Sequence, residues 1–199
     1  MVAIITGDIV NSREGEAAEW LETLKEALNA YGKNAIDWEI FRGDSFQLKT
    51  KVNKALEASL FIKACIKEHS AIDVRMAIGI GQVNGSNGKI IEDQGEAFYR
   101  SGHRFENLKS TRLAVETGDQ ELDSSLNLML DLGLLTFDNW TKIDALTLKT
   151  ALKFPEYTQK QIAKTLDKSP STVSFTLQKT GFKEILKLLE FYNHSVSKL

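Results

Sequence analysis

The first 117 residues alternate between short apolar runs and segments whose apolar residues have a helical spacing. Val2–Ile5 is apolar and is followed by Gly7 and Asp8, which predicts a buried strand that ends in a turn. Residues 14–31 carry apolar side chains every three or four positions, the pattern of an amphipathic helix. Residues 38–50 alternate along two arms around a Gly-Asp pair, which predicts a β-hairpin.

The same patterns continue with a helix over residues 53–69, a strong strand over 73–83, a helix over 95–109 and a short strand over 112–117. A turn-rich segment, NGSNGK, follows the strong strand. The order strand, helix, hairpin, helix, strand is the ferredoxin-like (βαββαβ) arrangement, here with one extra helix and strand. We therefore predict an α+β fold for residues 1–117.

The pattern becomes entirely helical from about residue 119, with interruptions at Pro155 and around Pro170. This change predicts a second, all-α domain over residues 118–199. Within it, residues 158–180 have the spacing of a helix-turn-helix, because small, apolar and capping residues fall in register. Its packing residues are Ile162, Ala163, Leu166, Val173 and Leu177, and Ser169 and Pro170 are placed to begin the second helix.

The charge distribution adds a reason to consider DNA as a partner of this tail. The chain has a net charge of −2, but residues 150–199 hold eight lysines, no arginine and four acidic residues, a net charge of +4. We expect DNA contacts from polar and basic side chains of the two helices, although no arginine is present to read bases. The candidates are Lys160, Lys164, Ser171, Thr172, Ser174, Gln178 and Lys179.

Two alternatives stay open for the tail. A helix-turn-helix of this composition is also compatible with protein contacts in place of DNA contacts. The amphipathic segment 182–192 suits either closure of the domain or dimerisation, and we expect a homodimer, because one weak module gains from pairing on two half-sites.

Composition places the chain among ordinary globular proteins, with 42% hydrophobic and 26% charged residues in 199. Cys65 is the only cysteine and lies among apolar residues at helical spacing, so we expect a core residue and no internal disulfide. No segment has the length of a membrane span, and the N-terminal apolar run is too short for a signal peptide. These features predict a cytoplasmic protein without a membrane partner.

Two carboxylates are the strongest candidates for chemistry in the first half. In the predicted topology Asp8 follows the first strand and Asp44 lies at the hairpin turn, so both belong to the same edge of the sheet. Two neighbouring carboxylates repel each other unless a cation lies between them, and Mg²⁺ commonly binds one or two carboxylates together with substrate phosphates. Each aspartate alone is more often a turn residue or a helix cap than a metal ligand, and Ser12 is better explained as a helix N-cap.

Three segments resemble known motifs at these positions: IITGDIVNS, FRGDSFQL and VRMAIGIG. They are similar to the core motifs of class III nucleotide cyclases, and the hairpin resembles the signature of GGDEF-type diguanylate cyclases. Over nearly its full length the chain resembles the SatD family of small bacterial proteins, which join such a domain to a helix-turn-helix tail. The resemblance implies a cyclase-type palm in which Asp8 and Asp44 bind metal. It also implies nucleotide contacts from Ile9, Asn11, Ser12, Arg42 and Ser45.

The chain departs from the cyclase pattern at its catalytic positions. Arg42 replaces a glycine of the GGDEF signature and Ser45 replaces an acid, while Tyr99 and His103 stand where an asparagine and an arginine stabilise the transition state. We therefore expect a regulator that binds a purine nucleotide, such as a nucleoside triphosphate, with Mg²⁺ through the palm and DNA through the tail. The alternatives are an active cyclase or nucleotidyltransferase with two-metal catalysis, or a protein-interaction adaptor that uses neither site.

Overall fold

The computed structural model describes residues 1–14, 16–69, 71–84 and 88–199, so part of the predicted NGSNGK turn lies outside the described residues. The first part of the chain forms β1 (Val2–Val10), α1 (Ala17–Asn29), β2 (Trp38–Phe41), β3 (Ser45–Thr50), α2 (Ala55–Ile66), β4 (Asp73–Gly81), α3 (Glu96–Glu106) and β5 (Leu113–Glu116). The second part forms α4 (Gln120–Phe137), α5 (Lys142–Lys153), α6 (Gln159–Leu166), α7 (Pro170–Lys179) and α8 (Phe182–Val196). Short 3₁₀ turns lie at Val52–Lys54 and Ile90–Glu92.

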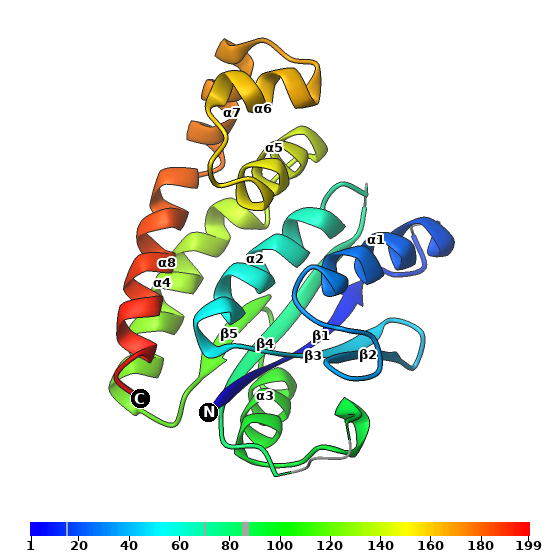
Figure 1. Cartoon of the computed structure of the whole chain (residues 1–199), viewed down its shortest axis with the longest axis vertical. Coiled ribbons are helices and arrows are strands. Elements are labelled where there is room, and N and C mark those ends of the chain that lie inside the picture. Colours follow the sequence, from blue (N-terminus) through cyan, green and yellow to red (C-terminus); the bar gives the residue numbers. More distant parts are fainter. Residues whose placement is uncertain (15, 70, 85–87) are drawn as a thin grey trace.

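β1 lies at the centre of a five-stranded mixed sheet with the order β2-β3-β1-β4-β5 (Figure 1). β1 pairs antiparallel with both β3 and β4, and β2 pairs antiparallel with β3. β1 and β2 therefore run in the same direction with β3 between them. β5 extends the sheet beyond β4 and runs parallel to it.

β1 continues to Val10, so the prediction of a turn at Gly7 and Asp8 is wrong. The neighbouring strands explain the extension, because Asp8 pairs with Ser45 of β3 on one side and with Arg75 of β4 on the other. Ladders on both sides outweigh the turn preference of a Gly-Asp pair, since tertiary context overrides local propensity.

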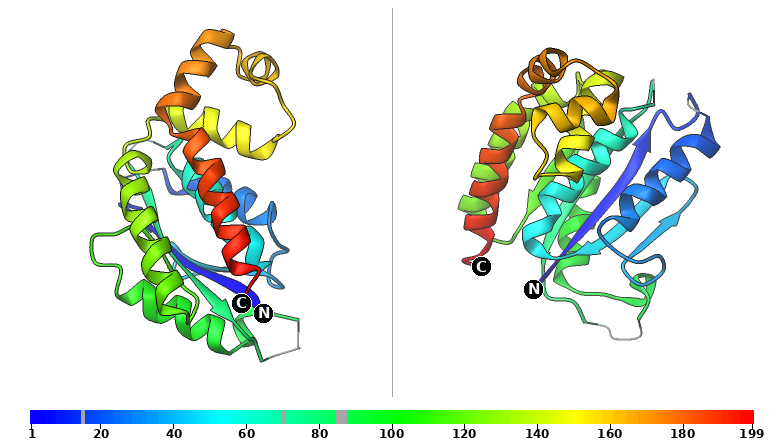
Figure 2. Two further views of the ribbon diagram at one scale, coloured as in Figure 1. Left: turned by 90° about the vertical axis from the view of Figure 1, so that its left-hand side faces the viewer. Right: turned by 45° about the horizontal axis from the view of Figure 1, so that its top comes forward.

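Helices cover both faces of the sheet, as the edge-on view shows (Figure 2). α1 and α2 pack on one face and α3 packs on the other, while α5 and α8 lie on the outer side of α2 and α4 lies beside β5. α3 lies so close to β4 at Gly79 that a Cβ atom on this residue would collide with the backbone of Ser101 and Ala97. A glycine at this position allows the contact.

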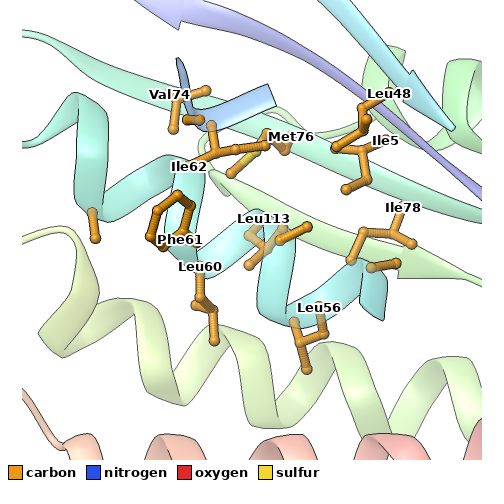
Figure 3. Packing of buried hydrophobic residues seen from close by; sticks show 14 of the residues in the cluster. Ile5, Leu48, Leu56, Leu60, Phe61, Ile62, Val74, Met76, Ile78 and Leu113 are labelled. Atoms are coloured by element: carbon orange, nitrogen blue, oxygen red, sulfur yellow. The ribbon is translucent and has the colours of Figure 1, made fainter. Parts of the chain in front are cut away.

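α2 is the central helix of the molecule and is buried on all sides (Figure 3). Eleven of its twelve residues are buried, which agrees with a mainly apolar sequence in which Glu57, Ser59 and Lys63 are the exceptions. It packs on Met76 and Ile78 of β4, and the same hydrophobic core includes Leu130 of α4, Leu148 of α5 and Leu189 of α8. The core is thus continuous across the predicted boundary at residue 118.

α5, α6 and α7 share a second, smaller core at the end of the molecule remote from β5 (Figure 1). As the sequence predicted, Ile162 and Ala163 of α6 pack there with Val173 and Leu177 of α7. Residues 167–169 separate the two helices, and the hydroxyl of Ser169 caps α7, whose first residue is a proline. Within the described part of the chain, no helix is long and apolar enough to cross a membrane.

Candidate functional site

Asp8 and Arg75 lie opposite each other in the β1–β4 pair and form a bidentate ion pair. Arg75 Nε donates to Asp8 Oδ1 and Arg75 Nη2 donates to Asp8 Oδ2, each over 2.8 Å. The guanidinium carbon lies 4.9 Å from the centre of the Phe105 ring, which places the pair next to α3. The hydrogen bond with Asp8 raises the pKa of the Arg75 guanidinium, so this side chain stays charged at physiological pH.

Asp44 lies beside Asp8 in the backbone, but its carboxylate has a different partner. The amide of Ile9 donates to the carbonyl of Asp44 over 3.1 Å, so the predicted neighbourhood of the two segments is present. Asp44 Oδ2 accepts a hydrogen bond of 2.8 Å from the hydroxyl of Ser12. The prediction that Ser12 caps the following helix is wrong, because α1 begins at Ala17, without a side-chain cap.

The other residues expected to hold a nucleotide are spread around this point. Ile9 has its side chain in the core and offers only its backbone. Asn11 has a left-handed backbone conformation, and its side-chain amide donates to the backbone carbonyl of Ala71. Arg42 is exposed at the hairpin turn, and Ser45 lies opposite Asp8 in the β1–β3 pair.

A cleft of about 400 Å³ opens beside the Asp8–Arg75 pair. The segment that leads into β5 lines it with Lys109, Ser110, Thr111 and Arg112. Sequence reasoning missed this segment, although KSTR is a compact run of basic and hydroxyl side chains at the start of a predicted strand. It also missed Arg75, the one basic residue inside the strongest predicted strand.

The charged side chains that line this cleft suit an anion better than a bare cation. Its lining contains Arg75, Lys109 and Arg112 but only one carboxylate, that of Asp8, and Arg75 already binds both oxygens of that carboxylate. No group of three or more histidine, cysteine, aspartate or glutamate side chains is placed to hold a metal ion in the part of the chain that the structure describes.

Tyr99 and His103, which depart from the expected cyclase pattern, have local partners on and beside α3. The ring of Tyr99 stacks on that of His103, and His103 Nδ1 lies 3.0 Å from a carboxylate oxygen of Glu116 in β5. Arg100 donates to the carbonyl of Ile80 in β4 and so holds α3 against the sheet.

The candidate DNA contacts lie on the exposed sides of α6 and α7. All seven are exposed: Lys160, Lys164, Ser171, Thr172, Ser174, Gln178 and Lys179. Lys179 also has a partner within the protein, since its Nζ lies 2.6 Å from Asp144 Oδ2 at the start of α5. This ion pair holds the C-terminal end of α7 against α5.

The mixed sheet, covered by helices and joined to further helices, defines a mixed α/β protein. The model of the SatD family matches residues 1–191, and the chain belongs to this family. A comparison with curated proteins finds no match, and a comparison with solved structures finds none either.

Proposed function

We propose that the protein is a cytoplasmic regulator that binds duplex DNA through α6 and α7. The observation that carries the proposal is the three-helix cluster of α5, α6 and α7, in which α7 follows α6 after three residues and presents a mostly polar face to solvent, with Phe175 also exposed on it. A helix-turn-helix reader places its second helix in the major groove in this way. Ser171, Ser174 and Gln178 are exposed on that helix and are able to hydrogen-bond to base edges or phosphates.

The number of cations predicts how strongly a single module binds. Lys160 and Lys164 are exposed on α6 and are placed for phosphate contacts, whereas Lys179 pairs with Asp144 and positions α7. With few phosphate contacts, one module binds weakly, and two-fold pairing on half-sites about one helical turn apart supplies the missing affinity.

The test is selection of the full-length protein on a pool of random DNA duplexes, followed by anisotropy titrations of the selected duplex over a range of salt concentrations. Each phosphate contact contributes about −0.9 to the slope of log K against log salt. We expect Lys160→Gln and Lys164→Gln to flatten that slope by about this amount each and Gln178→Ala to reduce sequence preference. Lys187→Gln, an equal charge change on the exposed side of α8, is the control. Absence of binding at low salt, or equal losses in the control, contradicts the proposal.

A second function, nucleotide binding, is favoured by the cationic cleft beside Asp8. We propose that the β2-β3-β1-β4 part of the sheet, with α1 and α2, is a ferredoxin-like, cyclase-type palm. In it, Arg75, Lys109 and Arg112 contact the phosphates of a purine nucleotide. Phosphate oxygens are matched by arginine in bidentate geometry and by lysine as a point charge.

Binding of Mg²⁺ in this proposal would require Arg75 to exchange Asp8 for a phosphate group. Asp8 would hold Mg²⁺ only together with a triphosphate, because Arg75 already binds both oxygens of its carboxylate and the phosphates would have to accept the released guanidinium. Asp44, whose carboxylate Ser12 holds on the neighbouring segment, is the second carboxylate within the proposed site.

Calorimetry with ATP and GTP, with and without Mg²⁺, tests this exchange. We expect Asp8→Asn to retain metal-free binding and lose the effect of Mg²⁺, whereas Arg75→Met weakens metal-free binding about tenfold or more. Asp131→Asn, on the exposed side of α4, is the control. No nucleotide binding, or binding that is the same in both variants, contradicts the proposal. Formation of a cyclic nucleotide that Asp44→Asn abolishes favours the enzyme alternative.

A further inference from the structure

A second polar cleft, of about 430 Å³, lies where the sheet meets the junction between α4 and α5. Its cations come from three separate segments: Lys67 follows α2, Arg112 precedes β5, and Lys142 begins α5. Asp73 and Asp138 also line it. Only Arg112 belongs to both this cleft and the one beside Asp8.

The two carboxylates are already neutralised by groups around the cleft. Nζ of the buried Lys63 lies 2.8 Å from Asp73 Oδ1 and 2.7 Å from Asp138 Oδ1. Asp138 Oδ1 is thus paired with Lys63 by charge, although it accepts no hydrogen bond among the described residues. Lys67 Nζ adds a contact of 3.4 Å to Asp73 and donates to the carbonyl of Asp138 over 2.6 Å.

Two cations of the cleft keep donors for a ligand. Arg112 Nε lies 3.7 Å from both Asp73 and Asp138, beyond hydrogen-bond length, and no hydrogen bond of its guanidinium occurs among the described residues. Lys142 is exposed and forms no ion pair within the described ranges. Lys63, Lys67, Arg112 and Lys142 thus outnumber the carboxylates by two positive charges, which favours an anion.

We propose that this cleft binds a small phosphate-type anion, either free or as the phosphate group of a metabolite, through Arg112, Lys142 and Lys67. Charge-assisted hydrogen bonds to phosphate are the natural use of an arginine and lysines that converge from different segments. The first turn of α5 contributes little, because the amide of Thr141 already donates to Asp144. Side chains therefore supply the binding.

The cleft is connected to α7 by two contacts of the α4–α5 junction. Trp140 lines the cleft, and its indole nitrogen donates to the carbonyl of Thr180, at the end of α7, over 3.3 Å. Asp144, in the first turn of α5, holds Lys179. An anion that draws Lys142 toward Arg112 acts on this junction, so its binding alters the position of α7. This second step rests on the proposed DNA binding, whereas the anion site itself does not.

Calorimetry on the full-length protein tests the site with inorganic phosphate, pyrophosphate and ribose 5-phosphate, at ionic strength matched with chloride. We expect saturable binding of at least one, with affinity about tenfold weaker in Lys142→Gln and in Lys67→Gln. Lys198→Gln, exposed near the C-terminus, is expected to bind as the wild type does. Preference for the sugar phosphate over both inorganic ions assigns the site to an ester, and the reverse assigns it to a free anion. No saturable binding, or unchanged affinity in Lys142→Gln, overturns the proposal.

The effect of the bound anion on α7 is tested separately, through the affinity for DNA. At a saturating concentration of the bound anion, the affinity for the selected duplex is expected to change in the wild type but not in Lys142→Gln. Trp140→Phe, which removes the hydrogen bond to Thr180, is expected to bind the anion and lose the effect on DNA. If the protein binds no DNA at all, the calorimetric result still decides the anion site, so the two failures are distinguishable. An unchanged DNA affinity in the anion-saturated wild type overturns the coupling.

Discussion

Lys63 and Asp73 form an ion pair of 2.8 Å in the interior, and the Lys63 side chain is fully buried. The lysine projects from α2, most of whose other residues are apolar, to the start of β4. Burying a charge costs several kcal/mol unless it is paired, so the position of this lysine is only stable with carboxylates around it. The contact therefore fixes the end of α2 to the first residue of β4.

Replacement of Lys63 by methionine keeps most of the apolar stem of the side chain but removes its charge, which leaves Asp73 and Asp138 with less compensation. We expect Lys63→Met to lower the free energy of unfolding by about 3–5 kcal/mol, the usual cost of breaking a buried pair from one side. Urea denaturation measures this loss, and Lys63→Met with Asp73→Asn should recover part of it, because the double variant no longer holds the unpaired charge. A single variant as stable as the wild type would show that the pair contributes nothing.

The strand and helix pattern was accessible from the sequence because periodicity is a local property. Spacing alone predicts the hairpin of β2 and β3, the helix α2 and the packing residues Ile162 and Val173, and the structure contains all of them. The extent of β1 could not be predicted, because its last residues are held by β3 and β4, which are distant in the sequence.

The pairing of Asp8 with Arg75 could not be predicted for the same reason. Arg75 is 67 positions away, and only the register of β1 against β4 brings the two residues opposite each other. Likewise, the cations around Arg112 converge from segments that share no sequence pattern. The burial of α2 can be predicted from the sequence, since a helix without a continuous polar side has to be covered by other elements.

Asp144 provides a pH-dependent contribution at the base of α7. Its burial acts to raise the pKa of the carboxyl, but hydrogen bonds from Lys179 and Thr141 outweigh this effect, so the pKa lies below its usual value. The folded state thus holds the proton less tightly than the unfolded chain does. The stabilisation is fully present above the unfolded pKa of about 3.9 and is lost as the pH falls through the lower, folded value.

We therefore expect Asp144→Asn to reduce the free energy of unfolding near neutral pH and to differ less from the wild type as the pH falls through the pKa of the folded carboxyl. Chemical denaturation at a series of pH values measures the difference. Asp131→Asn, on the exposed side of α4, should show little change throughout. A difference that stays constant with pH would mean that the charge of Asp144 is not what stabilises the junction.

Cys65 allows the opening of the core to be followed directly. It is the only cysteine, its side chain is buried, and burial raises the pKa of its thiol to about 12. Since the thiolate is the reactive form, we expect negligible reaction with Ellman's reagent in the native protein near neutral pH. The reaction should become fast in urea, with the same midpoint as unfolding followed by circular dichroism. Rapid labelling without denaturant would contradict the burial of α2.

A chain that ends at residue 117 tests whether the first part folds alone, as the change of composition near residue 118 predicts. Such a fragment lacks α4, α5 and α8, whose Leu130, Leu148 and Leu189 share one core with α2. The outer side of α2 would then expose a contiguous apolar surface, and surfaces of this kind promote association. We expect the fragment to aggregate, or to bind a hydrophobic dye and unfold without cooperativity, while the full chain unfolds in one transition. A monomeric fragment with a cooperative urea transition would establish residues 1–117 as an independent domain and would leave the shared core as a docking interface.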